Sequence, residues 1–247
     1  MPPLKQTLIW DLPTRLFHWT LALLVGLQFM TGLLGEDWLS LHALIGYATL
    51  TLILFRVLWG FFGGYWSRFS NFIPNPSQVL QFIKSVRSNS QPSVTKPTTR
   101  DSAATQPKAI DQKEFQFAGH NPLGALSVLF MLTLLFAQII SGLLSNDDIS
   151  FEGPFTRWVS NATVEWMTHY HSEVGFYLIP LFVGIHVLAV LYYKFKKTQN
   201  LTSAMIHGYK EVEAHIRAST DSFANRFLAL ALLALSALII YAILLLA

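Results

Sequence analysis

Apolar residues along this chain gather into five long runs separated by polar segments. Each run has about 19 to 24 residues, the length an α-helix needs to cross a hydrocarbon layer of roughly 30 Å. Open strands are excluded there because their edges would leave backbone groups unpaired in lipid. The pattern predicts an all-α membrane protein with five spanning helices, at residues 16–34, 41–62, 123–144, 170–193 and 227–247.

Composition agrees with this class. Of the 247 residues, 52% are hydrophobic and only 13% are charged, against about 25% charged in an average soluble domain. The first run follows Lys5 and Arg15, as in a signal peptide, but it is long and continues into "TGLLGEDW" without a cleavage-site pattern. We therefore expect it to be a retained helix.

Two of the polar segments show the apolar spacing of helices. Residues 76–87, "PSQVLQFIKSVR", and residues 203–216, "SAMIHGYKEVEAHI", are both predicted to be helices at the membrane surface. The segment at about 88–112 is rich in Ser, Thr, Gln and Pro, and its lack of bulky apolar residues predicts disorder.

Lysine and arginine are concentrated on one side of the predicted helices. Residues 1–15 carry two of the seventeen, residues 63–122 seven and residues 194–226 six, whereas the connections on the other side carry only one. The positive-inside rule then predicts a cytoplasmic N-terminus and, after five crossings, a C-terminus in the opposite compartment. The formal charge of +3 comes from these loops and does not indicate nucleic acid as a partner.

The chain contains no cysteine. This excludes disulfides, thiolate-held iron–sulfur clusters and the C-x-x-C-H attachment of covalent haem. A redox cofactor would have to be held by other ligands.

Four histidines fall at matching depths in the predicted helices. His18 opens an outward-running helix near the cytoplasmic face, whereas His42 and His171 open inward-running helices near the outer face. His186 comes fifteen residues after His171, which at ~1.5 Å per residue is about 22 Å deeper. The four therefore form two pairs, His18 with His186 and His42 with His171.

Helix geometry supports this pairing. His171 and His186 differ by about 60° around a regular helix, whereas the alternative, His169, is off the face by about 100°. Two stacked histidine pairs in a bundle without cysteine predict two haems, each with its iron between imidazoles from different helices. Gly46 and Gly175, one turn after a ligand, would let the flat macrocycle approach the backbone. Alternatively, each histidine forms a hydrogen bond between helices, and each glycine allows two helices to pack closely.

Two arginines are placed to meet the cytoplasmic haem. Arg56 lies about 21 Å inward of His42 and only ~40° off its face, and a charge at that depth requires a partner such as a haem propionate. Arg15, one turn before His18, is placed for the same edge. Alternatively, Arg56 extends its charge to the inner membrane interface.

His120 opens the stretch "GHNPLG", in which Asn121 is suited to cap a helix and Pro122 to take its first position. It is either an alternative to His186 as the partner of His18 or a solvated residue of the interface. Three further histidines are expected to be solvated, namely His169, His207 and His215.

A weak internal repeat relates two helix hairpins. "TGLLGED" (residues 31–37) ends the first predicted helix and "SGLLSNDD" (residues 141–148) ends the third, and each is followed by a helix that opens with H-x-x-x-G. Either the two hairpins share one plan or the match is chance, because Gly and Leu are common in membrane helices.

Several stretches together resemble one known family. "WDLPTRLFHW", "LHALIGYATLTLILFRVLWGF", "GHNPLGALSVLFMLTLL" and "HSEVGFYLIPLFVGIHVLAVLYYKFKKTQNLTSAMIHGYK" resemble the bacterial cytochrome b561 and nickel-hydrogenase b-type cytochrome family, which is related to the membrane subunits of formate dehydrogenases. The resemblance covers about residues 7–212. It implies a four-helix transmembrane haem-binding bundle within residues 1–222 and leaves residues 223–247 as an additional helix, for which partner docking is one role to consider.

The resemblance also implies two non-covalent b haems. The iron ligands would be His18 and His186 for the cytoplasmic haem, and His42 and His171 for the outer one. The implied function is respiratory electron transfer in the bacterial inner membrane, between quinone and a redox partner such as a c-type cytochrome or a hydrogenase or dehydrogenase subunit. Any enzyme activity would be quinone oxidation or reduction within such a complex, because the chain shows no nucleophile, general base or nucleotide loop.

Two other functions remain open from the sequence. A non-redox membrane anchor would use the histidines only for packing. A metal-ion transporter would use them as ligands, but it is disfavoured because Glu173 is the only acidic residue in the predicted helices.

Overall fold

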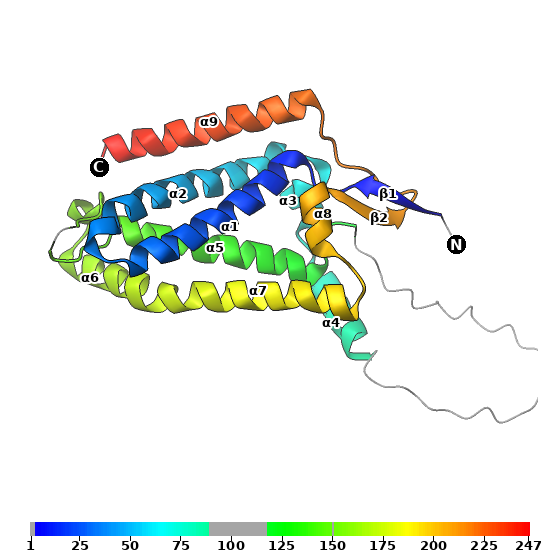
Figure 1. Ribbon diagram of the computed structural model, residues 1–247, viewed down its shortest axis with the longest axis horizontal. Helices are drawn as coiled ribbons and strands as arrows, with labels where there is room; N and C mark the ends of the chain where they lie inside the picture. The colour runs from blue at the N-terminus through cyan, green and yellow to red at the C-terminus, as the bar shows by residue number, and fades with distance from the viewer. Residues whose placement is uncertain (1–2, 89–117, 150) are drawn as a thin grey trace, which may run out of the picture.

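The computed structural model describes residues 3–88, 118–149 and 151–247. Its described part contains five helices that are long and apolar enough to cross a membrane, and these run along one another (Figure 1). The predicted all-α membrane class is therefore confirmed, with helix ends that differ by a few residues from those expected. The spanning helices are α1 (Leu12–Leu33), α2 (Leu39–Phe62), α5 (Pro122–Leu143), α7 (Phe176–Lys196) and α9 (Phe223–Leu245).

Shorter elements lie at the two ends of the bundle. One end, here called the sheet end, carries the strands; the other, called the loop end, carries the connections α1–α2 and α5–α7 (Figure 1). The predicted disordered segment at about 88–112 lies, apart from its first residue, outside the described residues. The shorter elements are β1 (Leu4–Leu8), η1 (Glu36–Trp38), η2 (Tyr65–Ser67), α3 (Phe69–Phe72), α4 (Pro76–Ser88), η3 (Thr156–Trp158), α6 (Asn161–His169), η4 (Tyr170–Gly175), α8 (Leu201–His207) and β2 (Tyr209–Glu213).

The fourth spanning segment is longer and less regular than the sequence predicted. It begins at α6 and runs through η4, a π-helical turn, into α7, so that 36 residues form one continuous helical segment. A regular α-helix had been expected from residue 170, and that expectation was wrong for Tyr170–Gly175. A π turn takes more residues than an α turn and is frequent at functional sites. It changes the direction in which His171 points relative to His186.

The sheet end is closed by two strands that the sequence did not predict. β1 and β2 pair antiparallel, with Leu4 opposite Glu213 and Leu8 opposite Tyr209. The helix expected over residues 203–216 ends at His207, because Gly208 adopts a left-handed conformation with φ of 89° that favours glycine. The helix expected at residues 76–87 is confirmed as α4.

A buried carboxylate organises the start of α1. Asp11 is fully buried and caps the helix by accepting a hydrogen bond from the backbone N–H of Thr14 (2.9 Å). It also accepts from the Ser67 hydroxyl (3.1 Å) and from the indole N–H of Trp59 (3.4 Å). One side chain thus ties the start of α1 to the end of α2 and to η2.

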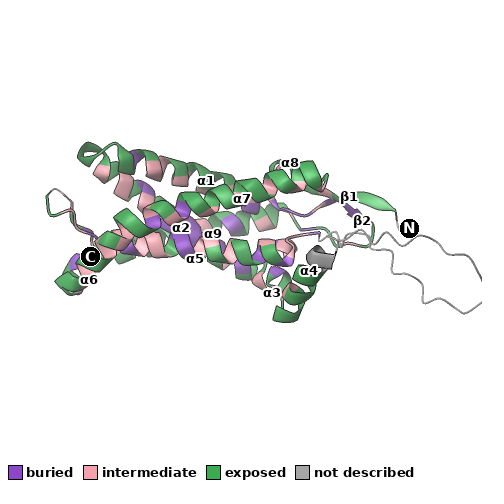
Figure 2. Ribbon diagram, turned by 90° about the horizontal axis from the view of Figure 1, so that it is seen from below, coloured by how far each residue is buried: buried purple, intermediate pink, exposed green. Residues whose placement is uncertain are grey.

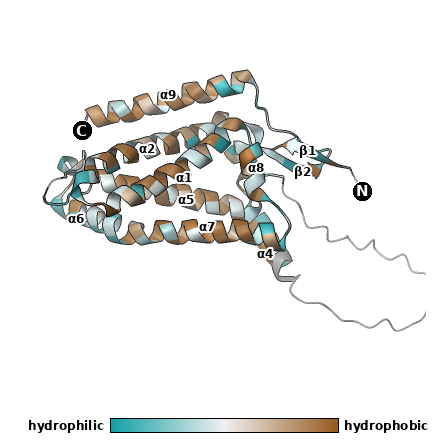
Figure 3. Ribbon diagram, viewed as in Figure 1, coloured by the Kyte–Doolittle hydropathy of each residue, from teal (hydrophilic) through white to brown (hydrophobic). Residues whose placement is uncertain are grey.

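The spanning helices consist mostly of apolar residues (Figure 3), and many of their large apolar side chains are exposed. The burial pattern leaves α7 exposed along much of its length (Figure 2), and its one buried residue is Ile179. Exposed apolar side chains in such numbers mark a surface that meets lipid. The chain therefore presents its hydrophobic faces to a membrane and keeps only a narrow buried core.

Helix α9 packs along α2, on the side of the bundle away from α7 (Figure 1). Ala229 joins the buried cluster of Phe17 and Trp59, and Ile240 joins the cluster of Leu50. The first described residue and the last lie at opposite ends of the bundle, as an odd number of crossings requires (Figure 1).

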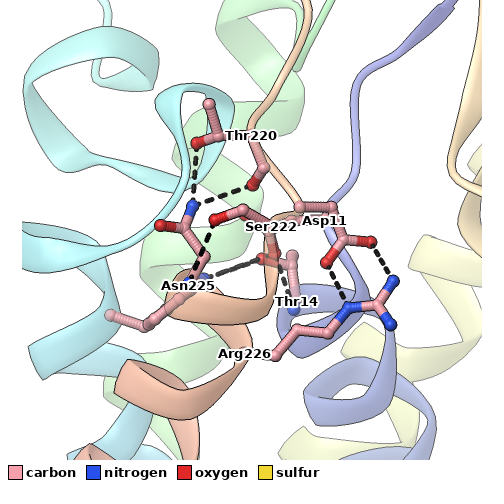
Figure 4. A network of polar contacts seen from close by, with 8 residues as sticks. Asp11, Thr14, Thr220, Ser222, Asn225 and Arg226 are labelled. Atoms are coloured by element: carbon pink, nitrogen blue, oxygen red, sulfur yellow. Dashed lines mark hydrogen bonds and ion pairs between the residues drawn. The ribbon is translucent and has the colours of Figure 1, made fainter.

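Polar side chains fix the start of α9 (Figure 4). The Ser222 hydroxyl caps the helix by accepting from the Asn225 N–H at 3.3 Å, and the Asn225 amide donates to the Thr220 hydroxyl at 2.8 Å. Arg226 forms an ion pair with Asp221 at 2.9 Å. These contacts set the direction in which the fifth helix leaves the sheet end.

Candidate functional site

Two histidines from different helices face each other near the loop end of the bundle. His42 lies in the first turn of α2, and His171 lies in the π turn η4. Their ring centroids are 5.9 Å apart with the rings perpendicular, at 89°. Both side chains are half-buried. The structure thus brings together the two residues that were predicted to form the outer pair, here called the loop-end pair.

Helix α1 holds His42 through a set of hydrogen bonds. The Nδ1 atom of His42 lies 3.1 Å from the backbone oxygen of Gln28 and 3.1 Å from the Thr31 hydroxyl. In return, the side-chain amide of Gln28 donates to the backbone oxygen of His42 at 2.9 Å. Gln28 therefore binds the same histidine twice, once with its backbone and once with its side chain.

Helix α5 holds His171 in the same way. The Nδ1 atom of His171 lies 2.9 Å from the backbone oxygen of Gln138 and 3.3 Å from the Ser141 hydroxyl. The Gln138 amide donates to the backbone oxygen of His171 at 2.9 Å. The two arrangements form one repeated motif, Gln-x-x-Thr/Ser-Gly, which we call the glutamine frame.

The glutamine frame fixes which ring nitrogen carries the proton. A carbonyl oxygen can only accept a hydrogen bond, so the Nδ1 atom of each loop-end histidine must be the donor. The Nε2 atom then keeps its lone pair free. Histidines that bind metals are usually held in this manner, with one ring nitrogen donating to a backbone carbonyl and the other facing the metal.

Glycines make room for the loop-end pair. A methyl group on Gly142 would lie 2.7 Å from the Cε1 atom of His171, and one on Gly32 would lie 3.3 Å from the Cε1 atom of His42. Gly46 and Gly175 had been predicted to face a macrocycle. A side chain at either position would meet the amide of Gln28 or of Gln138, and the role beside a macrocycle stays a prediction. In this structure these two glycines serve the glutamine frame.

A second pair of histidines lies toward the sheet end. His18 of α1 and His186 of α7 have ring centroids 6.3 Å apart, with the rings at 50°. Both are half-buried. Within the described residues, the buried Nδ1 atom of His18 has no hydrogen-bond partner. This sheet-end pair therefore has the spacing of the loop-end pair without its frame.

The two predicted arginines lie at the sheet end, each in contact with protein groups. Arg15 donates to the backbone oxygen of Ile206 at 2.6 Å, while its buried Nε atom has no partner among the described residues. Arg56 is only 3% exposed and donates to the backbone oxygen of Ser67 at 3.3 Å. Its guanidinium also lies 5.5 Å from the ring centres of two phenylalanines, Phe69 and Phe72.

His120 is not the solvated residue that one interpretation of the sequence suggested. Its ring packs against Trp10 at 4.7 Å and Phe72 at 5.4 Å, and its buried Nδ1 atom has no partner in the described part of the chain. Burial lowers the pKa of His120 to about 3, and the positive charges of Arg56 and Lys210 act in the same direction. His120 is therefore neutral at physiological pH. As predicted, Asn121 caps α5 and Pro122 opens it.

The spacing of both pairs suits a metal ion held between two imidazoles. With metal–nitrogen bonds of about 2 Å, two opposed ring nitrogens lie roughly 4 Å apart, and the ring centres lie somewhat further apart. Centroid distances of 5.9 and 6.3 Å match this requirement. Among the described residues there is no group of three or more His, Cys, Asp or Glu side chains that could hold a metal ion. Two ligands for each metal suit haem, whose ring supplies the remaining nitrogens.

Sequence reasoning missed Gln28 and Gln138. The signal was present, because "QFMTGLL" and "QIISGLL" extend the noted repeat by three residues toward the N-terminus. The remaining histidines are exposed, as predicted: His169, His207 and His215.

Comparison with known proteins gives one match. The model of a family described as prokaryotic cytochrome b561 matches residues 9–208 of this chain. The matched segment contains both histidine pairs and both glutamine frames and ends before α9. No curated protein and no solved structure matches the chain.

Proposed function

The chain belongs to the prokaryotic cytochrome b561 family, a group of membrane b-type cytochromes that transfer electrons, and from this premise we propose that it is a dihaem cytochrome. His18 and His186 would hold the iron of one b haem, and His42 and His171 that of the other. The observation that carries the proposal is the occurrence of two opposed histidine pairs, one toward each end of a single bundle.

Bound haem would supply a one-electron centre at each pair. The residues of the chain orient the imidazoles and separate the two centres along the bundle. At the sheet end, Arg15 and His120 offer buried nitrogen atoms that have no partner within the described residues. Such atoms suit the carboxylates of a haem, because charge-assisted hydrogen bonds are strong where water is excluded. Arg56, which is buried nearby, would add its positive charge to this edge.

The two centres would carry electrons across the bacterial inner membrane. We propose that one end exchanges electrons with quinone and the other with a redox partner protein, such as a c-type cytochrome or a hydrogenase or dehydrogenase subunit. The distribution of lysine and arginine supports a cytoplasmic sheet end and a periplasmic loop end. The C-terminus of α9 would then be periplasmic.

The test is haem content and optical spectra of the detergent-purified protein. The parent should carry two b haems per chain, and His42→Leu and His186→Leu should each remove a different one. His169→Leu is the matched control, since His169 is exposed and lies two residues before His171; it should keep both haems. A colourless parent produced with ample haem would refute the cytochrome function and leave the non-redox anchor.

A further inference from the structure

The strongest feature beyond the histidine pairs is the difference in how their ring nitrogens are held. Both loop-end histidines have Nδ1 bonded to a backbone oxygen and to a hydroxyl. At the sheet end, by contrast, the Nδ1 atom of His18 is buried and has no partner among the described residues. The same difference separates two sites that are otherwise built alike.

We propose that the glutamine frames are positioning elements that make the loop-end histidines the stronger electron donors, so that the loop-end haem has the lower midpoint potential of the two. The inference rests on the dihaem function proposed above and adds a direction to it. Electrons would pass favourably from the loop end to the sheet end.

The first reason is the hydrogen bond at Nδ1. When Nδ1–H donates to a carbonyl oxygen, electron density moves toward the ring, and Nε2 becomes a more basic ligand. A more basic ligand stabilises oxidised iron more than reduced iron, because the oxidised ion carries the higher charge. The short bond from His171 to the Gln138 oxygen, 2.9 Å, makes this effect strong at the loop end.

The second reason is the charge around the sheet-end pair. Arg15 lies one helical turn before His18. The buried guanidinium of Arg56 lies over the ring of Phe72, and that ring packs against His120. Positive charge near a redox centre favours its reduced form, because the reduced form has one positive charge fewer. This raises the potential at the sheet end, so both reasons give the same sign.

The experiment removes the two hydroxyls of the frames. Each hydroxyl is a second acceptor for the Nδ1–H of its histidine, so its loss should make Nε2 a weaker donor. Thr31→Val and Ser141→Ala, alone and combined, are compared with Thr49→Val and Ser236→Ala in haem-loaded protein by potentiometric titration. The control hydroxyls each donate only to a carbonyl of their own helix, Thr49 to Ile45 and Ser236 to Leu232. The double variant should raise the lower of the two potentials by about 59 mV, which is a tenfold change in relative affinity for a one-electron couple. The controls and the higher potential should not move.

The haem that remains in the His186→Leu variant identifies the loop-end centre, and its potential should match the lower value. Should Thr31→Val lose haem altogether, Thr31→Ser keeps the hydroxyl and should restore both haem and potential. The inference is overturned if the loop-end haem has the higher potential, or if the frame variants leave its potential unchanged. A protein that binds no haem would overturn the proposed function as well, so the two failures are distinguishable.

Discussion

The loop end and the sheet end of this bundle each hold a pair of histidines, but they do so in two different ways. At the loop end, helices α1 and α5 hold the neighbouring histidine rings directly, because the backbone oxygen of a glutamine accepts a hydrogen bond from each ring. At the sheet end, the rings lie in a setting fixed by other groups: the buried Asp11, the ring of His120 packed against Trp10, and two short strands. The orientation of the loop-end rings and the structure around the sheet-end rings are therefore fixed by different residues. Substitutions should affect the two ends independently.

Loss of the Asp11 carboxylate should have the largest effect. Asp11→Ala removes the cap of α1 and leaves the buried donors of Ser67 and Trp59 with only the Thr14 hydroxyl to share as a partner. Together these should lower the free energy of unfolding by about 2–4 kcal/mol. On heating in detergent, the sheet-end haem should be lost before the loop-end haem.

The control for Asp11→Ala is Asp37→Ala, because Asp37 is an exposed acid in η1 at the loop end. It should leave the thermal midpoint of the protein unchanged. If Asp11→Ala has the same thermal midpoint as the parent protein, the hydrogen bonds of this carboxylate do not stabilise the sheet end.

A single methyl group should break the loop end selectively. Gly175→Ala places its Cβ against the Oε1 atom of Gln138. The side-chain amide must then move, and its Nε2 atom loses the hydrogen bond that it donates to the backbone oxygen of His171. Loss of such a supporting contact typically costs 10- to 100-fold in metal affinity, and we expect a loss in this range for the loop-end haem alone. The loss is measured as the fraction of haem that the variant retains when a haem-free haem-binding protein competes for it.

Gly184→Ala is the matched control for this change, since a methyl group at Gly184 of α7 would meet nothing within 4 Å. It should retain both haems. Equal haem loss in the two variants would mean that helix propensity or folding, and not the glutamine frame, explains the result.

Acid pH should lower the stability of the sheet end, and this is the smallest of the three expected effects. The pKa of His120 is about 3 in the folded chain, below its ordinary value of 6.5, so the unfolded chain takes up the proton first. Stability should therefore fall as the pH drops below 6.5, by at most about 1.4 kcal/mol per pH unit. Thermal midpoints of the haem-free protein at pH 7 and pH 5 measure this.

His120→Phe keeps an aromatic ring between Trp10 and Phe72 but cannot bind a proton. The variant should lose this part of the pH dependence while its midpoint at pH 7 stays close to that of the parent. An unchanged pH dependence would place the responsible group elsewhere.

The sequence predicted the helices and the meeting of the histidines because both follow from one-dimensional rules. Span length gave the five crossings, and helix direction gave the depths at which His18 meets His186 and His42 meets His171. These rules need no knowledge of which helices are neighbours. That the four histidines bind iron stays a prediction.

The features that were missed depend on contacts between distant segments. The two strands are short and polar and exist only because residues 4–8 meet residues 209–213. The π turn at Tyr170–Gly175 breaks the regular 100° rotation on which the angle between His171 and His186 was based. The glutamine frames form only where α1 approaches α2 and where α5 approaches η4. The repeat in the sequence, even at its full length, therefore does not predict which atoms form hydrogen bonds.

The pairing of β1 with β2 has a consequence for biosynthesis. Leu8 and Tyr209 are neighbours in the sheet although four of the five spanning segments lie between them in the chain. At about 5–20 residues per second, the first strand must wait roughly 10–40 seconds for its partner to leave the ribosome. During that interval the glutamine of α1 can already meet its histidine on α2, whereas His18 waits for α7. The contact of α1 with α2 would then form before either histidine pair is complete, because His171 leaves the ribosome only fifteen residues before His186.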